Sequence, residues 1–517
     1  MKKLSIGIQT FSKLLKENCI YVDKTDIIHQ LITRGSYYFL SRPRRFGKSL
    51  LVSTLAEIFR GNRELFTELA IGSSSYDWEP HPVVLISFAS MSHSTPATLE
   101  NSIKVYLQDI AQDYNINIPN SLTPGESLRH LIKQLSKINS VVLLIDEYDY
   151  AILQHIHQPE AADAIREILK SFYAVIKDSD PYLRFVFLTG ISKFPRTSIF
   201  SGLNNLEDIS LDTRYNNLLG YTKPEITTYF QDYLTHITQQ HDYNLDELLA
   251  KIELWYDGYL FCGASTANKL YNPFSVLLFL SKERFSNYWF ETGTPTFLIN
   301  LLKQHHYPMQ DFESIHATEL ELGMFDVKII PLKTLLFQTG YLTIQGYDTL
   351  TSNYILGYPN KETTDSLSSL VLSSMTSLSI NHFSTTAAKL LQLFQEYKLQ
   401  ELQTLLTTIF AAIPYGIHVN EEKYYQTIFY LILKMINAHI IVEQQTNIGR
   451  IDAVIETKND CFIIEFKINA SAETAMQQIE NKMYYQQYLS LNKNITLIGI
   501  AFDTTIKNVS EVTYKKI

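Results

Sequence analysis

Short apolar runs alternate with amphipathic segments through the first part of the chain. Four runs have the length and the apolar character of strands: 37–40, 83–88, 141–145 and 184–190. Between them, apolar residues recur at helical spacing, as in 128–135 and 161–176. The run 141–145 contains no polar residue, which is typical of a strand buried on both faces. Strands that alternate with helices predict a mainly parallel sheet that helices cover on both faces.

The pattern changes in the second part of the chain. Residues 230–345 are rich in aromatic side chains, with a helix around 276–280, and 390–410 has the leucine spacing of two amphipathic helices. Residues 363–386 are dense in Ser and Thr but keep apolar residues at helical spacing, which predicts a surface helix with a linker. The last part reads as a helix at 421–432, strands at 440–443, 449–455 and 461–468, a helix at 470–488 and a strand at 495–502.

The first predicted strand runs directly into a loop that suits a polyphosphate. The loop reads Arg42-Pro43-Arg44-Arg45-Phe46-Gly47-Lys48-Ser49 and opens a helix. Backbone N–H groups at a helix N-terminus bind phosphate, Lys48 can reach the β- and γ-phosphates, and the Ser49 hydroxyl can ligate Mg²⁺. The usual motif has a glycine where Arg42 stands. We expect this loop to bind ATP; the alternative is a basic loop without a ligand.

Two carboxylates, Asp146 and Glu147, follow the buried run 141–145. They lie at the C-terminal end of a predicted parallel strand, where open α/β sheets bind their ligands. An aspartate in this place can hold Mg²⁺, and a following glutamate can polarise the attacking water. We therefore expect Asp146 and Ser49 to hold Mg²⁺ and Glu147 to act in catalysis. Thr189, at the end of the fourth strand, could sense the γ-phosphate. A solvated turn after a core strand is the alternative for the carboxylates.

Composition limits the class of protein. The chain has 517 residues, of which 45% are hydrophobic and 19% charged, so it can form the cores of several domains. Its net charge is −9, so a nucleic acid would have to be met by local basic patches such as the arginines of the loop. The three cysteines are scattered and give neither a disulfide framework nor a zinc spacing. The N-terminus lacks the apolar core of a signal peptide and no apolar run is long enough to span a bilayer, which predicts a cytoplasmic protein without a membrane segment.

Several blocks of the sequence resemble the bacterial AAA-ATPase-like domain proteins. These blocks are 39–49, 146–149, 188–192, 200–208, 220–222, 255–259, 271–275 and 288–293. The resemblance covers nearly the whole chain. It implies an additional-strand P-loop ATPase core, with a helical lid after Gly220. Members of this group resemble the present chain in carrying Arg-Pro-Arg-Arg-Phe-Gly-Lys-Ser as the loop, so Arg42 is the family's own departure from the usual motif.

A second group of charged residues lies in the C-terminal part. Asp452, followed on the next strand by Glu465-x-Lys467, resembles the arrangement of PD-(D/E)xK nucleases, and of the nuclease domain that commonly ends AAA-ATPase-like proteins. Asp452 and Glu465 would converge on one Mg²⁺, and Lys467 would orient the attacking water. Glu422 on the preceding helix could add a carboxylate, and Gln478 on the following helix could position the substrate or the lysine. Exposed charges on a pair of strands are the alternative.

Together these patterns predict an α/β protein with four parts. They are an AAA-like P-loop domain with a parallel sheet at 1–220, a helical lid and middle region at 221–357, a helical connector at 358–412, and an α/β PD-(D/E)xK nuclease-like domain at 413–517. We expect ATP and Mg²⁺ as cofactors and nucleic acid, DNA in preference to RNA, as the partner; a homo-oligomer is left open. The predicted function is ATP binding and hydrolysis coupled to Mg²⁺-dependent phosphodiester cleavage. The alternative is a nucleotide-dependent switch or scaffold whose nuclease-like domain binds a partner or nucleic acid without cutting.

Overall fold

The computed structural model describes the chain except for a set of short segments: 157, 195–198, 200–202, 204, 294–314, 324–330, 376–379, 413–427, 434–438, 447–448 and 458. The chain separates into two compact units. The first comprises Met1–Thr294 and Ser314–Glu362, and the second comprises Pro295–Glu313 and Thr363–Ile517. Among the residues that the structure describes, no helix combines the length and the apolar character needed to cross a membrane.

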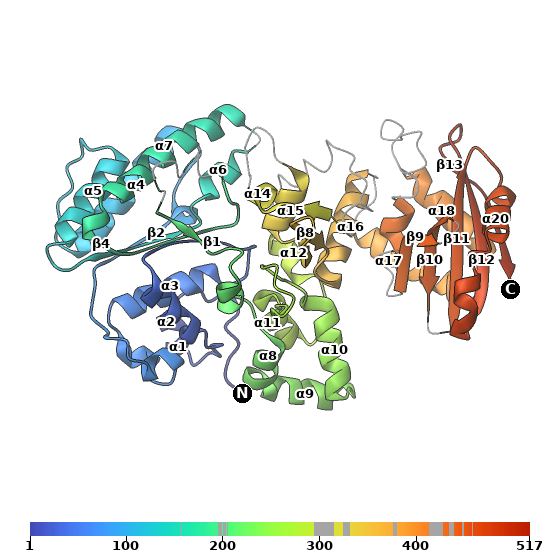
Figure 1. Cartoon of the computed structure of the whole chain (residues 1–517), viewed down its shortest axis with the longest axis horizontal. Helices are drawn as coiled ribbons and strands as arrows, with labels where there is room; N and C mark the ends of the chain where they lie inside the picture. The colour runs from blue at the N-terminus through green and yellow to red at the C-terminus, as the bar shows by residue number, and fades with distance from the viewer. Residues whose placement is uncertain are drawn as a thin grey trace. The chain divides into compact units, whose positions relative to one another are not determined.

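A five-stranded sheet forms the centre of the first unit (Figure 1). Its strands are β1 (Tyr37–Ser41), β2 (Val83–Ser87), β3 (Val141–Asp146), β4 (Leu183–Gly190) and β5 (Glu207–Asp208). They lie in the order β2-β3-β4-β1-β5, and neighbouring strands run parallel. The predicted parallel sheet is therefore confirmed. Because β4 lies between β1 and β3, the sheet also contains the additional strand that the family resemblance implies.

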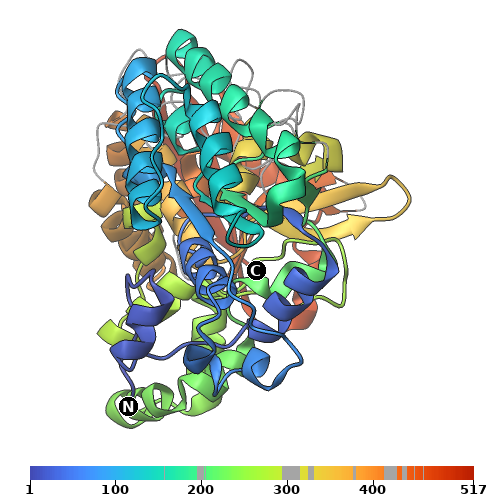
Figure 2. The same cartoon turned by 90° about the vertical axis from the view of Figure 1, so that its left-hand side faces the viewer.

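Helices cover both faces of this sheet, as Figures 1 and 2 show. One face carries α1 (Phe11–Lys16), α2 (Thr25–Arg34) and α3 (Lys48–Phe59), and the other carries α4 (Pro96–Asp113), α5 (Pro124–Leu135), α6 (Tyr150–Gln154) and α7 (Pro159–Asp178). The sequence specifies these helices locally. In α5, for example, Thr123 and Glu126 form a capping box at the start, and Leu128, Leu131 and Leu135 are buried on one face. Every residue of β3 is buried, as the unbroken apolar run predicts.

The middle region combines helices with a small sheet. The helices are α8 (Lys223–Tyr229), α9 (Gln231–His241), α10 (Leu245–Tyr256), α11 (Pro273–Lys282), α12 (Tyr288–Gly293), α14 (Glu319–Leu322) and α15 (Leu332–Thr339). The antiparallel sheet has the order β6-β8-β7, formed by β6 (Ile315–Ala317), β7 (Thr343–Asp348) and β8 (Asn353–Gly357). The middle region is thus largely helical, as expected, and it also contains a small sheet that was not predicted. A hairpin turn at Asp348, whose side chain accepts from the backbone N–H of Leu350, lets β7 and β8 pair.

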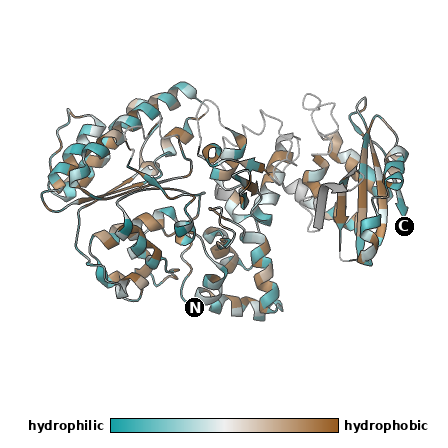
Figure 3. Ribbon diagram, viewed as in Figure 1, coloured by the Kyte–Doolittle hydropathy of each residue, from teal (hydrophilic) through white to brown (hydrophobic). Residues whose placement is uncertain are grey.

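The second unit contains a five-stranded mixed sheet flanked by helices. The helices are α17 (Ile380–Gln395), α18 (Leu399–Ala411) and α20 (Ala472–Asn481), while α16 (Lys361–Met375) begins in the first unit and continues into the second. The strands are β9 (His439–Thr446), β10 (Gly449–Glu456), β11 (Asp460–Ile468), β12 (Asn494–Asp503) and β13 (Asn508–Lys516), in the order β13-β12-β11-β10-β9. β11 and β12 pair in parallel, and the other neighbouring pairs are antiparallel. Figure 3 shows β11 and β12, two inner strands of this sheet, as predominantly hydrophobic.

Two expectations for this unit need correction. The helix predicted for 470–488 ends at Asn481, and the edge strand β13 was not predicted. The helix expected on the surface from residue 363 is instead buried along most of 362–372. Its hydroxyls can be buried because they bond to the helix backbone: Ser369 Oγ donates to the Asp365 carbonyl oxygen at 2.7 Å. A Ser- and Thr-rich composition therefore does not place this helix at the surface.

Candidate functional site

The predicted phosphate loop connects β1 to α3. Gly47 is the N-cap of α3 and has a φ of 94°, in the left-handed region that favours glycine. No side chain caps this helix end, so its backbone N–H groups are left for a ligand. Lys48 is only 6% exposed, and its ammonium donates to the carbonyl oxygens of Arg42 and Pro43, each at 2.9 Å. The Lys48 side chain thus links the end of the phosphate loop to its beginning.

The carboxylates at the end of β3, Asp146 and Glu147, interact electrostatically with this lysine. Burial lowers the pKa of Lys48, and the charges of Glu147 and Asp146 oppose that shift. Burial likewise raises the pKa of Asp146, while a hydrogen bond from the Ser49 side chain lowers it. The structure therefore brings together Ser49 and Asp146, the two residues expected to hold Mg²⁺ in this unit. Asp146 Oδ1 is buried and has no hydrogen-bond partner among the described residues, which suits a ligand for a cation.

Glu147 stands in an unusual backbone conformation. Its φ is 53°, which a residue with a Cβ adopts only at a cost. Burial, and then the neighbouring charge of Asp146, raise its pKa. The side chain lines a cavity of about 330 Å³ next to the loop. The other residues that line this cavity include Gly7, Gln9, Arg44, Arg45, Gly47, Lys48, Ser49, Tyr150 and Tyr221. A larger cavity, of about 1030 Å³, lies around α1 and includes none of the predicted site residues.

Three residues of the loop face away from this cavity. The Arg42 side chain is 1% exposed, and its Nη1 donates to the carbonyl oxygen of Ser210 at 2.6 Å. Its guanidinium carbon lies 4.1 Å from the ring centre of Phe261, and burial lowers its pKa to about 9. Phe46 packs edge-on against Phe261 as well. Pro43 lies against Gly340, where a Cβ would come within 2.7 Å of the proline ring. Arg42, Pro43 and Phe46 thus fasten the loop, whereas Arg44, Arg45, Gly47, Lys48 and Ser49 line the cavity.

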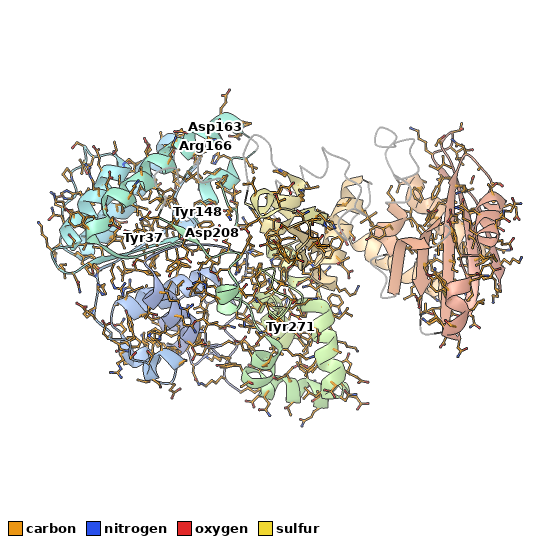
Figure 4. The ribbon with its side chains drawn as sticks, in the orientation of Figure 1. Tyr37, Tyr148, Asp163, Arg166, Asp208 and Tyr271 are labelled. Atoms are coloured by element: carbon orange, nitrogen blue, oxygen red, sulfur yellow. The ribbon has the colours of Figure 1, made fainter. Side chains whose placement is uncertain are left out.

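A tether between the ends of β3 and β4 was not predicted. Asp149 is buried, and its Oδ2 accepts from the backbone N–H of Ile191 at 3.0 Å and from the N–H and hydroxyl of Ser192 at 2.6 and 2.5 Å. The Tyr148 hydroxyl donates to the Ser192 carbonyl oxygen at 3.0 Å. Burial raises the pKa of the Tyr148 phenol, and the charge of Asp208 contributes to this shift; Figure 4 labels both residues. The Asp146–Asp149 block was part of the family resemblance, but its last two residues carried no assigned role.

Thr189 and Lys193 follow the same strand. Thr189 is fully buried beside the strand of Asp146, and its hydroxyl has no partner within the described part of the chain. Lys193, four residues further along, forms an ion pair with Asp208. Thr189 therefore keeps the place expected of a sensing residue, while Lys193 is engaged elsewhere.

The second group of predicted residues meets on β10 and β11. These strands are antiparallel, with Ala453 opposite Ile464, so Asp452 and Glu465 are the next neighbours along the pair. Asp452 Oδ2 accepts from the backbone N–H of Phe466 at 2.8 Å. Glu465 is 2% exposed, and its Oε1 accepts from Lys467 Nζ at 3.4 Å and from Gln478 Nε2. The structure thus brings together four of the predicted residues.

Burial and the neighbouring charges dominate the electrostatics of this group. Burial and the charge of Asp452 raise the pKa of Glu465 to about 7, and Lys467 opposes the shift. The second oxygen of Glu465, Oε2, is buried and has no hydrogen-bond partner among the residues described. Glu422, the expected third carboxylate, lies outside the described residues. Within the described residues, no group of three or more His, Cys, Asp or Glu side chains is placed to hold a metal ion together.

Comparisons with known proteins give one family match in each of the two units. Residues 5–200 match the model of the AAA-ATPase-like family, described as predicted AAA-ATPase, and residues 420–512 match the PD-(D/E)XK nuclease superfamily. Along its whole length the chain is similar to a protein of Azotobacter chroococcum mcd 1 named "Uncharacterized protein in vnfD 5'region", with 38% identity over 98% of each chain. The chain belongs to the AAA-ATPase-like family. This AAA-ATPase-like protein carries a nuclease-superfamily domain at its C-terminal end, as the sequence predicted.

Proposed function

We propose that the first unit of this protein binds ATP with Mg²⁺ and hydrolyses it. The observation that carries this proposal is the meeting of Ser49 and Asp146 beside an uncapped helix N-terminus. The residues fit the ion, because one buried oxygen of Asp146 has no partner in the described chain and the Ser49 hydroxyl already bonds to this carboxylate.

Each residue of the cavity has a place in this chemistry. The ammonium of Lys48 would leave the two loop carbonyls and contact the β- and γ-phosphates. The N–H groups that start α3 would bind the phosphate oxygens, and Arg44 would add positive charge to the cavity. Glu147 would orient the attacking water, a role that requires the side chain in its deprotonated form. Bound Mg²⁺ would supply charge neutralisation for the phosphates.

We propose that the second unit cleaves phosphodiester bonds in nucleic acid, with DNA as the favoured substrate, and that the ATPase unit controls it. Asp452 and Glu465 would hold Mg²⁺ through carboxylate oxygens, and the ion would polarise the scissile phosphate. Lys467 would orient the attacking water and stabilise the charge that develops. Gln478 would hold the buried carboxylate of Glu465 in the orientation that the ion needs.

A switch protein without nuclease activity is the second candidate. It is favoured by the small number of carboxylates: within the described residues only Asp452 and Glu465 meet at this site, and the pKa of Glu465 is raised to about 7. A carboxyl that is partly protonated near neutral pH holds a divalent cation weakly. In this case the second unit would bind nucleic acid or a protein without cutting it.

One experiment separates the two candidates. The purified full chain is incubated with single- and double-stranded DNA and RNA in Mg²⁺ or Mn²⁺, with and without ATP. Glu465→Gln and Asp452→Asn serve as variants that keep side-chain size, and Asp460→Asn, a buried carboxyl at the start of the same strand, serves as the matched control. Cleavage by the wild type and the control, lost in both site variants, supports the nuclease. Binding without cleavage in every protein supports the switch.

The ATPase proposal has its own test. Lys48→Ala removes a charge-assisted contact to phosphate, worth about 1.5–3 kcal/mol, or roughly 10- to 150-fold in ATP affinity. Glu147→Gln should leave affinity unchanged and slow hydrolysis. Equal ATP affinity of wild type and Lys48→Ala in calorimetry would refute the assignment of the loop.

A further inference from the structure

Trp289 of α12 donates hydrogen bonds from both its side chain and its backbone. Its side chain is fully buried, and the indole Nε1 donates to the carbonyl oxygen of Arg44 in the phosphate loop at 3.1 Å. Its backbone N–H donates to Glu362 Oε1 at 2.7 Å. One residue therefore connects the phosphate loop to the first turn of α16, and all three residues belong to the first unit.

Glu362 makes a second contact that also leads to the nucleotide cavity. Its Oε2 accepts from the Ser275 hydroxyl at 2.7 Å. Ser275 follows Phe274 in the first turn of α11, and Phe274 lines the cavity and lies under Arg45, whose guanidinium carbon is 5.0 Å from the ring centre. The two oxygens of Glu362 thus hold two segments, α11 and α12, that each contact the loop.

The environment of Glu362 is costly for a structural carboxyl. The side chain is 1% exposed, and burial raises its pKa to about 8. An apolar residue of similar size could fill the same volume without that penalty. What an apolar residue could not do is accept from both a backbone N–H and a hydroxyl on different helices.

The start of α16 cannot easily move away from these contacts. Asn360 Nδ2 donates to the carbonyl oxygen of Asp257 at 2.7 Å. Gly258 has a φ of 103°, and a Cβ there would come within 1.9 Å of the Pro359 carbonyl oxygen. The segment that precedes Glu362 is therefore fitted closely against the end of α10, and Glu362 is presented to Trp289 from a fixed backbone.

We propose that Glu362 is a positioning residue for the phosphate loop, which acts through Trp289, and that nucleotide binding is thereby coupled to the order of the first turns of α16. The proposal rests on the ATP binding proposed above. Because coupling between two sites is reciprocal, a ligand that fixes the Arg44 carbonyl also favours the bonded state of Glu362. Helix α16 continues into the second unit. The ordering of its first turns therefore affects the segment that covalently joins the ATPase to the nuclease-like domain.

A double-mutant cycle tests this mechanism in the full chain, with ATP and Mg²⁺ as the probe. Trp289→Phe removes the indole N–H but keeps the backbone donor, and Glu362→Ala removes both acceptors. Each should weaken ATP binding about three- to tenfold in calorimetry, the range for loss of one hydrogen bond. If Glu362 acts through Trp289, the double variant should be no weaker than the weaker single variant. Glu362→Gln, which keeps an acceptor for the Trp289 N–H and a group that can bond to the Ser275 hydroxyl, should restore affinity.

Hydrogen exchange gives the complementary measurement. Addition of ATP should slow exchange of the amides at 362–372 in the wild type and in the control Asp460→Asn, and should not do so in Trp289→Phe. Additive losses of affinity in the cycle, unchanged affinity in both single variants, or ATP-dependent protection that persists in Trp289→Phe would each overturn the inference while the ATPase proposal stands. A wild-type chain that binds no ATP would overturn the ATPase proposal and this inference with it.

Discussion

Asp149 offers the sharpest test of how the ends of β3 and β4 are held together. All three of its hydrogen bonds fall on one oxygen, Oδ2, whereas Oδ1 has no hydrogen-bond partner among the described residues. An asparagine whose amide oxygen takes the place of Oδ2 keeps every acceptor contact. An alanine loses all of them. The pair Asp149→Asn and Asp149→Ala therefore separates the hydrogen bonds from the charge.

The expected magnitudes differ clearly. In Asp149→Ala the backbone N–H groups of Ile191 and Ser192 stay buried without an acceptor, at about 1–3 kcal/mol each, and the lost packing adds to this. A destabilisation of about 3–6 kcal/mol is expected, which is a large share of the roughly 5–15 kcal/mol that a folded domain has. In Asp149→Asn the bonds weaken, but the cost of burying the charge, which raises the pKa of Asp149, is removed. The net change should stay within about 1.5 kcal/mol.

Hydrogen exchange of the β3 and β4 amides provides the assay, because it reports the stability of this unit without assuming that the whole chain unfolds in one step. Asp149→Ala should lower protection there far more than Asp149→Asn. Equal losses in the two variants would mean that the negative charge itself is needed. No loss in Asp149→Ala would mean that the tether does not contribute to stability.

Three further predictions follow from other contacts. Gly190→Ala should destabilise the first unit by more than about 2 kcal/mol in a urea titration, because a Cβ there would lie 2.6 Å from the Tyr148 ring and 2.6 Å from Asp149; a neutral result would contradict the close packing at this strand end. The folded-state pKa of Glu362 is about 8, against an ordinary value of 4.5, so the folded protein binds this proton more tightly than the unfolded chain does. The free energy of unfolding should therefore fall as pH rises from about 4.5 to 8. Glu362→Gln should flatten that dependence, and an unchanged pH profile would show that the group is not buried as described. Lys467→Ala should slow phosphodiester cleavage while Mg²⁺ affinity in calorimetry changes little, and loss of metal binding would assign the lysine a structural role.

The pH prediction for Glu362 depends on the groups around it. Ser275 Oγ and the backbone N–H groups of Trp289 and Tyr288 bond to the carboxyl and lower its pKa against the larger effect of burial. The charge of Glu362 contributes to raising the pKa of Tyr256, and burial already holds the pKa of that phenol far above its usual value. The phenol therefore stays neutral through the range in which Glu362 titrates, and the carboxyl dominates the pH dependence at this place.

Local sequence patterns predicted the elements that carry the chemistry. The apolar run before Asp146 and the Gly47-Lys48-Ser49 turn are short-range features, because strand burial and a helix N-terminus are set by neighbouring residues. The convergence of Asp452 and Glu465 could be expected for the same reason, since both stand on adjacent strands of one hairpin.

What the sequence did not reveal depends on contacts between distant segments. Arg42 looked like a phosphate ligand because it belongs to a basic loop, but its side chain is buried against Phe261, more than two hundred residues along the chain. The burial of α16 was missed because Ser and Thr hydroxyls can satisfy themselves on the helix backbone, which composition does not show. The β7–β8 hairpin was missed because its pairing depends on a turn chemistry that we did not weigh.

The contacts that fix the phosphate loop limit where the chain can be truncated without disturbing the loop. The side chains that fix the loop from outside, Phe261, Phe274 and Trp289, all come after residue 260. A fragment that ends near Gly220 would keep every residue of the nucleotide motifs and lose each of these supports. The nucleotide motifs therefore end well before the residues that hold the phosphate loop in place. A fragment that stops at the end of the motifs would contain the whole phosphate-binding sequence but lack the side chains that fix the conformation of the loop.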